Sequence, residues 1–364
     1  MRRAAATFAI LVSACSTSKT TPKAADAAAP LVAVAAVAAD AAPAPGPLTL
    51  PDDPAAPGPW PVGVRTLTLA GLRAEVWYPA RPGSEAGRAP VAYDLAEELP
   101  PADAARLRAK GVTLPPVPCA CFRDLPLDEA HGPYPLVLYA HGLTLFRFAS
   151  ATLTAHWASR GFVVVAADFP GAKLADVLEG KPRPSNGAVA ADAARVLDAA
   201  AQEVFPGHLD VARVGITGHS LGGEVASLLA GQGRGQVIIS MAERGVAPAP
   251  GRPPPKFLTL IVGGTEDHVE PFARQERGFA TSPEPKRFAA IRGAGHMSFT
   301  DVCSVAVAEG GLYAVAHAAG VEMDGFLAAL ADRACGQAKI PPAEAWAQIE
   351  SVTTAALEAA LSTR

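Results

Sequence analysis

The residues with the clearest chemical potential lie in the segment Gly218-His-Ser-Leu-Gly222, which follows a short apolar run and precedes a helix-like pattern. Glycines two positions before and after Ser220 predict a tight turn between a strand and a helix, because such a turn leaves no room for side chains there. The hydroxyl would then project at the amino end of a helix, whose free N–H groups and dipole favour developing negative charge. The segment predicts a serine nucleophile, with a phosphate-binding helix entry and a purely structural turn as alternatives.

A serine nucleophile needs a base within hydrogen-bond reach, and the chain has eight histidines to offer. His296 lies in Gly293-Ala-Gly-His-Met-Ser-Phe299, a loop after the last predicted strand, where small neighbours would let the imidazole reach the serine. Taken alone, the same residue is compatible with an exposed loop histidine. His219 adjoins the serine, but the turn would direct it away from the hydroxyl, and His317 lies in a helical stretch. We therefore predict that His296 is the general base.

The imidazole in turn needs a carboxylate that fixes its tautomer and stabilises its charged form. Asp267 lies just after the predicted strand 257–262, in a position to meet a loop at the same sheet edge. The alternatives are Glu266 beside it, Asp301, which would cap a following helix, and Asp168, which would shape the turn after an earlier strand. The chain order of the predicted triad is the one expected on an α/β sheet: Ser220, Asp267, His296.

A tetrahedral intermediate carries an oxyanion that two backbone N–H groups should meet. One donor is predicted to be Leu221, directly after the serine. The other is predicted to be Leu143, in the loop after the apolar strand 135–140, where Gly142 would let the backbone approach closely. A simple turn glycine is the alternative explanation of Gly142.

Strand-length apolar runs alternate with helix patterns through most of the chain. Such runs are buried on both faces, so they predict a mostly parallel central sheet flanked by helices, with functional residues at the carboxyl ends of the strands. A hairpin at 62–78 would add the first two strands, and 341–361 would form a closing helix. Residues 241–256 are only a short Pro-rich loop, so no large lid is expected, and no function is assigned to 81–132. The predicted strands after the hairpin are 135–140, 161–167, 212–217, 236–240, 257–262 and 288–292.

Four segments resemble the α/β-hydrolase superfamily, and more narrowly its platelet-activating-factor acetylhydrolase and dienelactone-hydrolase-like branch. They are Tyr139-Ala-His-Gly-Leu143, Ala158-Ser-Arg-Gly-Phe-Val163, Gly218-His-Ser-Leu-Gly-Gly223 and Gly293-Ala-Gly-His-Met-Ser-Phe-Thr-Asp301. The resemblance implies the α/β-hydrolase fold and a cofactor-free serine hydrolase that cleaves small or lipid-like esters with short acyl groups. Dienelactone hydrolases use cysteine where this chain has Ser220, so their substrate is not carried over. Two other functions stay open: a non-catalytic envelope binding protein on the same fold, and an amidase or acyltransferase with the same triad.

The amino terminus predicts export. Residues 1–14 combine two arginines with a short apolar run and read as a signal peptide, and the run ends at Leu-Val-Ser-Ala-Cys15, which resembles a bacterial lipoprotein box. Cys15 would carry the lipid, residues 15–58 would form a disordered Ala/Pro-rich tether, and 59–364 would be the catalytic domain. The expected location is the bacterial cell envelope, at the periplasmic face or the outer membrane. An ordinary secretory signal with a chance cysteine is the alternative.

The remaining composition narrows the possible partners. The net charge of −4 offers no basic face for nucleic acid.

Four cysteines besides Cys15 allow three pairings, of which we favour Cys303 with Cys335; Cys119 and Cys121 would then be free, or the pairings crossed. Spacings typical of metal sites are lacking, so no metal is predicted. The oligomeric state does not follow from the sequence.

Overall fold

The computed structural model describes residues 48–247, 257–305 and 338–362, together with single positions between 315 and 325. The predicted signal peptide, Cys15, Cys335 and most of the predicted tether lie outside these residues. No helix in the described residues is both long and apolar enough to cross a membrane.

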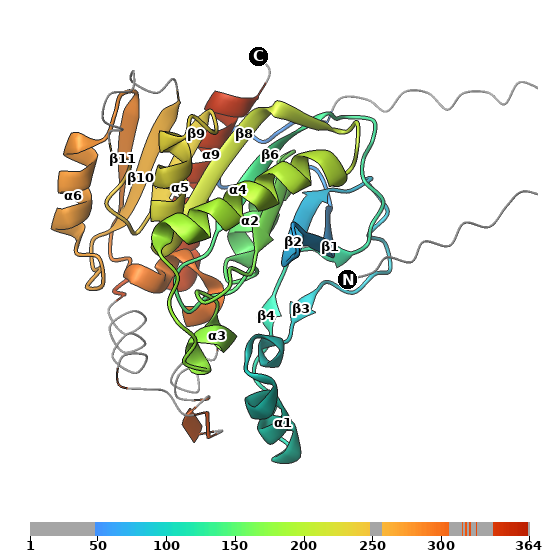
Figure 1. Ribbon diagram of the computed structural model, residues 1–364. Helices are drawn as coiled ribbons and strands as arrows, with labels where there is room; N and C mark the ends of the chain where they lie inside the picture. The colour runs from blue at the N-terminus through green and yellow to red at the C-terminus, as the bar shows by residue number, and fades with distance from the viewer. Residues whose placement is uncertain are drawn as a thin grey trace, which may run out of the picture. The chain divides into compact units, whose positions relative to one another are not determined.

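The described chain is built on one large sheet, in the strand order β11-β10-β9-β8-β6-β7-β2-β1-β5 (Figure 1). Six neighbouring strands, from β11 to β7, run parallel, and only β2 pairs antiparallel, with β7 on one side and β1 on the other. The predicted mostly parallel sheet is therefore confirmed. The strands are β1 (Val62–Leu69), β2 (Leu72–Pro79), β5 (Phe122–Arg123), β6 (Tyr134–Ala140), β7 (Val163–Ala167), β8 (Leu209–His219), β9 (Val237–Met241), β10 (Leu258–Gly264) and β11 (Lys286–Ile291).

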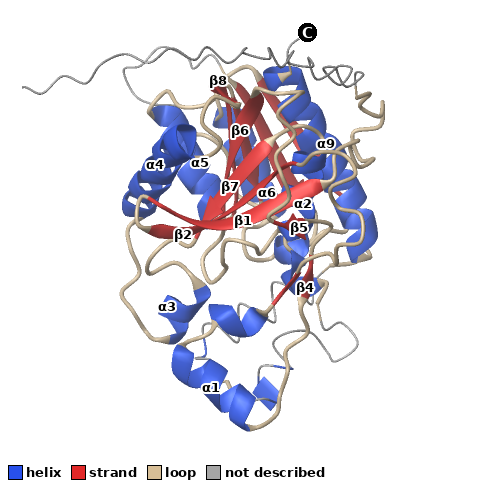
Figure 2. Ribbon diagram, turned by 90° about the vertical axis from the view of Figure 1, so that its right-hand side faces the viewer, coloured by secondary structure: helices blue, strands red, loops and turns tan. Residues whose placement is uncertain are grey.

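Helices cover both faces of this sheet, because successive side chains of each strand point to opposite faces. In β6, Leu136 and Leu138 pack in a core with α4 and α5, whereas Val137 and Tyr139 pack in a second core with α2 and α9. Figure 2 shows these two helix pairs on opposite sides of the strands. The helices are α1 (Pro101–Ala109), α2 (Ala151–Ser159), α3 (Leu174–Leu178), α4 (Asn186–Glu203), α5 (Leu221–Gly231), α6 (Phe272–Thr281) and α9 (Pro342–Leu361), with 3₁₀ turns η1 (Leu95–Glu98), η2 (His296–Phe299) and η3 (Asp301–Cys303).

The segment between β2 and β6 forms a small excursion from the sheet. It contains η1, α1 and a two-stranded sheet of β3 (Ala92–Tyr93) and β4 (Val117–Pro118). Cys119 and Cys121, whose pairing the sequence left open, form a disulfide with 5.1 Å between their Cα atoms. The predicted bridge from Cys303 to Cys335 stays a prediction, because Cys335 is outside the described residues.

The end of the predicted tether is part of the globular domain. The guanidinium of Arg160, 3% exposed at the end of α2, donates hydrogen bonds to the carbonyls of Pro51 (2.9 Å), Asp53 (3.1 Å) and Ala56 (2.7 Å). Residues 51–56 are thus bonded to the end of α2, within the segment predicted as a tether. Composition could not reveal this, since a Pro-rich segment cannot form a core but can still satisfy a buried cation through its carbonyl groups.

Candidate active site

Ser220 lies on a sharp turn between β8 and α5, at backbone angles φ +53° and ψ −120°. A residue with a side chain rarely adopts a positive φ, and such a conformation costs about 1–3 kcal/mol, so the surrounding structure must impose it. A Cβ atom on Gly218 would lie 2.1 Å from the carbonyl oxygen of Gly222, and one on Gly222 would lie 1.9 Å from that of Ala140 at the end of β6. Both flanking positions therefore require glycine, for the steric reason predicted from the sequence.

His296 and Asp267 form a buried pair. The Nδ1 atom of His296 lies 2.9 Å from Oδ2 of Asp267, and each residue is 3% exposed. Since an ionised carboxylate only accepts hydrogen bonds, we assign the proton to Nδ1, which leaves the lone pair of Nε2 available as a base.

Three further donors hold the Asp267 carboxylate in place. The N–H groups of Val269 (2.9 Å) and Glu270 (2.8 Å) donate to Oδ1, and the side-chain amide of Gln275 in α6 donates to Oδ2 (3.0 Å). The loops themselves are joined as well, because Glu266 N–H donates to the carbonyl of Ala294 (2.9 Å). The acid and the histidine loop are thus fixed to each other at the carboxyl ends of β10 and β11.

His219 connects this pair to the serine turn. Its Nε2 lies 2.9 Å from the carbonyl oxygen of His296 and therefore donates to it, and the two rings are 4.9 Å apart. Burial first, and then the neighbouring His296, lower the pKa of His219 to about 3, so this imidazole is neutral at physiological pH. Because His219 immediately precedes Ser220, the bond places the loop of His296 beside the serine turn.

The two predicted oxyanion donors are both available. Leu221 is the first residue of α5, and the first N–H groups of a helix have no acceptor within the helix. The N–H of Leu221 has no other acceptor in the described part of the chain, whereas those of Gly223 and Glu224 bond to the carbonyl of Ser220. The N–H of Leu143 likewise has no acceptor among the described residues. Two unused donors at neighbouring strand ends are what a developing oxyanion requires.

The other candidate acids have different partners. Asp301 accepts from the N–H (3.0 Å) and the hydroxyl (2.6 Å) of Thr152, so it caps α2 and not a helix that starts at its own position. Asp168 binds Arg147, and Glu266 pairs with Lys339 (2.7 Å). Among the four carboxylates considered from the sequence, Asp267 is the one in contact with His296.

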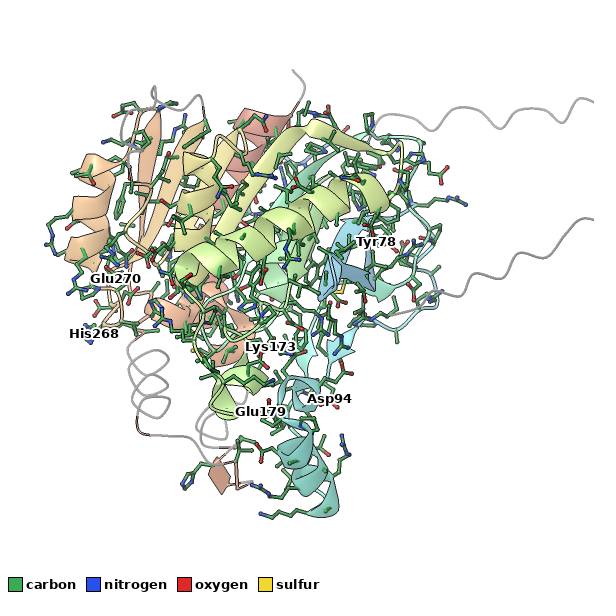
Figure 3. The ribbon with its side chains drawn as sticks, viewed as in Figure 1. Tyr78, Asp94, Lys173, Glu179, His268 and Glu270 are labelled. Atoms are coloured by element: carbon green, nitrogen blue, oxygen red, sulfur yellow. A yellow bond between two sulfur atoms is a disulfide. The ribbon has the colours of Figure 1, made fainter. Side chains whose placement is uncertain are left out.

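The structure brings together, at one edge of the sheet, Asp267 and His296, which are 29 positions apart, and the serine turn, where His219 bonds to His296 across 77 positions. Figure 3 shows this edge from the side, with Lys173 after β7 and His268 after β10 both lying below the strands. Sequence reasoning missed Gln275 and the bridging role of His219, since neither has a spacing signal that links it to its partner.

Comparisons with known proteins agree with this architecture. The family model for chlorophyllase matches residues 109–256. The solved structure of a ferulic acid esterase from Streptomyces cinnamoneus aligns with a TM-score of 0.61 at 24% sequence identity, over 85% of this chain and 93% of that one.

Two uncharacterised proteins of Mycobacterium tuberculosis, from strains CDC 1551 and H37Rv, are 32% identical to this chain over 190 residues. The match covers 45% of this chain and 64% of each relative. The parallel sheet, the helices on both faces and the structural match together show that the fold is that of the α/β-hydrolase superfamily.

Proposed function

We propose that the protein is a serine hydrolase that cleaves carboxylic esters with small or short acyl groups. The observation that carries the proposal is the His296–Asp267 pair, held by His219 beside a serine in the strained backbone conformation of a nucleophile elbow. The structural similarity to a ferulic acid esterase supports ester cleavage as the reaction class. The finer assignment to small or lipid-like esters, as in platelet-activating-factor acetylhydrolases, rests on the sequence resemblance.

The mechanism follows from the donors and acceptors at the site. His296 Nε2 accepts the Ser220 proton as the hydroxyl oxygen attacks the ester carbonyl, and the N–H groups of Leu143 and Leu221 stabilise the oxyanion. Asp267 stabilises the imidazolium that forms. His296 then protonates the leaving alcohol, which gives an acyl-enzyme. Water attacks the acyl carbon with His296 again as base, and Ser220 leaves as a hydroxyl.

A fluorophosphonate probe and p-nitrophenyl esters of increasing acyl length test this function. Wild-type protein should be labelled at Ser220 and should hydrolyse acetyl or butyryl esters faster than long-chain ones. Ser220→Ala should abolish labelling and reduce kcat by at least about a thousandfold. Folded wild-type protein that resists the probe and cleaves no ester would instead support a non-catalytic envelope binding protein.

We also propose that the protein is exported and anchored to the bacterial envelope through lipid on Cys15. The support is the lipoprotein-like segment before Cys15, and one covalently modified cysteine with more than one acyl chain would give stable anchoring. Cys15→Ser should move the protein from the membrane fraction to the soluble fraction after cell breakage. Retention of this variant in the membrane fraction would argue against lipid anchoring.

A further inference from the structure

Arg147 is the centre of a buried charge cluster outside the predicted triad. Its side chain is 1% exposed and contacts the carboxylates of Glu75 (Nε to Oε2, 3.2 Å), Asp168 (Nη1 to Oδ2, 3.0 Å) and Glu98. Burial alone would lower the pKa of Arg147, but Asp168, Glu98 and Glu75 raise it above its usual value. We call these four residues the Arg147 cluster.

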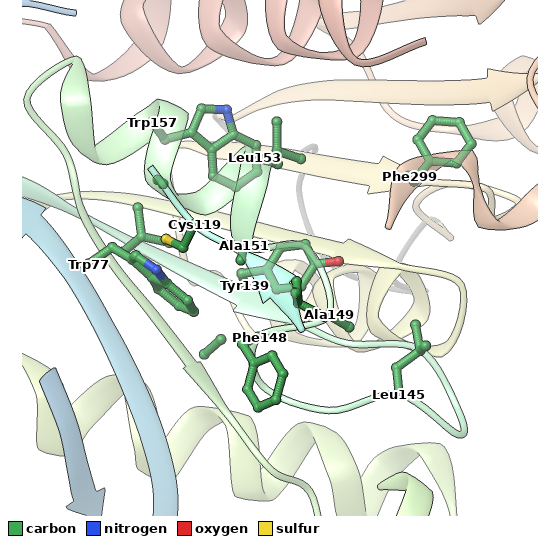
Figure 4. Packing of buried hydrophobic residues seen from close by; sticks show 14 of the residues in the cluster. Trp77, Cys119, Tyr139, Leu145, Phe148, Ala149, Ala151, Leu153, Trp157 and Phe299 are labelled. Carbon is green, nitrogen blue, oxygen red and sulfur yellow. The ribbon is translucent and has the colours of Figure 1, made fainter. Parts of the chain in front are cut away.

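The Arg147 cluster lies at the end of the loop that carries the predicted oxyanion donor Leu143. Figure 4 shows Leu145 and Phe148 on this loop, after Tyr139 of β6. The N–H of Arg147 donates to Oδ1 of Asp168 (2.8 Å), while the guanidinium binds Oδ2 of the same carboxylate. The backbone N–H and the guanidinium of Arg147 thus each bind one carboxylate oxygen of Asp168.

The start and middle of the loop are held by the same neighbouring segment, residues 168–174. Phe169 N–H donates to Nε2 of His141 (3.2 Å), Thr144 N–H donates to the carbonyl of Ala172 (2.9 Å), and Leu174 N–H donates to the carbonyl of Leu145 (3.0 Å). With the bond between Arg147 and Asp168, residues 141–147 are joined to 168–174 at four points. Leu143 lies between these points, so its N–H direction follows from the position of 168–174.

The buried carboxylates of the cluster depend on Arg147. A buried carboxylate without a partner is costly, and without Arg147 only Glu75 would keep an ion pair among the described residues, with Arg123. The excursion between β2 and β6 helps to keep water out, because Tyr93 stacks on Phe148 with ring centroids 4.3 Å apart, and the Arg147 guanidinium lies 4.9 Å from the centroid of the Phe148 ring. Lysine could not replace the arginine, since an ammonium lacks the planar fork that meets several carboxylates at once.

We propose that Arg147 is a positioning residue for the oxyanion hole, which holds the loop 141–147 in register with 168–174 through Asp168. It does not touch the substrate; it sets where the Leu143 N–H points. This inference rests on the proposed ester hydrolysis, in which that N–H stabilises the tetrahedral intermediate.

The test compares Arg147→Lys with a matched control, Arg160→Lys. Arg160 is also a buried arginine, paired with Glu358 (2.7 Å) and bound to backbone carbonyls at the opposite end of α2. Arg147→Lys should lower kcat for a p-nitrophenyl ester about ten- to a hundredfold, with KM changed less than about threefold, because an oxyanion donor acts mainly in the transition state. Arg160→Lys should lower the melting temperature without this loss of kcat.

A trifluoromethyl ketone provides a second readout, because its tetrahedral adduct carries an oxyanion. Its inhibition constant should rise in Arg147→Lys by about the same factor as kcat/KM falls, whereas a merely loosened fold would not produce this proportionality. If Arg147→Lys does not fold, Asp168→Asn takes its place. The asparagine can still accept from the Arg147 N–H but loses the charge, so a smaller loss of the same kind is expected.

Amide hydrogen exchange separates this inference from the proposed function, since it needs no activity. Faster exchange in residues 141–147 is expected in Arg147→Lys and not in Arg160→Lys. An inactive wild type would overturn ester hydrolysis, and the exchange result would still decide whether Arg147 fixes the loop. Unchanged kcat and unchanged exchange in a folded Arg147→Lys, or equal effects in both variants, would overturn the positioning role.

Discussion

At the scale of single residues, the orientation of the Asp267 carboxylate is fixed by the groups that donate hydrogen bonds to it. His296 and the Gln275 amide meet one oxygen, and two backbone N–H groups meet the other. These bonds leave the carboxylate little freedom to turn, and they hold the imidazole with Nε2 as its basic atom.

Asp267→Asn should therefore prevent His296 from acting as the general base, with little change in the stability of the fold. An asparagine amide presents an N–H to the histidine, which favours the wrong tautomer, so kcat should fall about a thousand- to ten-thousandfold while KM stays within a few fold. Steady-state kinetics on a p-nitrophenyl ester measure both constants. Asp301→Asn is the control, because Asp301 caps α2 and does not contact His296. A folded Asp267→Asn that retained near wild-type kcat would remove Asp267 from the mechanism.

At the scale of elements, the junction of α9 with α2 and η3 contains two acids that are poorly solvated. Burial and the nearby Asp301 raise the pKa of Glu350 in α9 to about 7, and burial raises the pKa of Asp301 to about 6. His156 in α2 uses Nε2 to donate to the carbonyl of Pro54 (2.9 Å), so its Nδ1 lone pair faces Glu350 at 3.8 Å. Because this nitrogen carries no proton, His156 does not donate a hydrogen bond that would stabilise the ionised form of Glu350.

This junction predicts a stability that falls as the pH rises. An acid whose pKa is higher in the folded than in the unfolded state contributes its full stability below the unfolded pKa, which is near 4.5 for Glu350. That contribution is lost as the pH rises through the folded pKa of about 7. Glu350→Gln removes the titrating group, so relative to wild type it should gain at most about 3 kcal/mol at pH 8, less where solvent screens the partly exposed carboxylate, and almost nothing at pH 4. Urea unfolding at the two pH values measures the difference. An equal effect at both pH values would show that folding does not raise the pKa of Glu350.

At the scale of the whole molecule, the amino-terminal segment and the last helix meet on Arg160. This buried guanidinium binds Glu358 in α9 and three carbonyls between residues 51 and 56. The Gly58 N–H adds a bond to the Ser159 hydroxyl (2.9 Å). Two distant parts of the chain are thereby fixed to the end of α2.

Shortened proteins should reveal where the domain begins. A protein that starts at residue 48 keeps the carbonyl partners of Arg160, so it should melt at the same temperature as the full-length chain. A protein that starts at residue 59 loses all three carbonyls, and an incompletely bonded buried cation should cost about 1–3 kcal/mol. Calorimetry of the two proteins measures the loss. Equal melting temperatures would mean that the tether extends to residue 58, as composition alone predicts.

The sequence by itself determined the fold class, and it predicted Ser220, Asp267 and His296 as a catalytic triad. Apolar runs specify buried parallel strands, and in such a sheet functional residues gather where the strands end, so candidate residues after those runs could be picked out one by one. The tight turn at Gly218 and Gly222 could also be predicted from the local sequence, because its steric requirement involves only the turn itself and the adjacent strand end.

Only the tertiary structure decided which distant groups hold these residues in place. Arg147 meets Glu75 across 72 positions, and Arg160 meets Ala56 across 104. A contact between side chains that far apart leaves no periodicity or spacing in the chain, because it depends on how strands and helices are stacked. The same reason explains why the structure, and not the sequence, joined Pro51 to Arg160 across 109 positions.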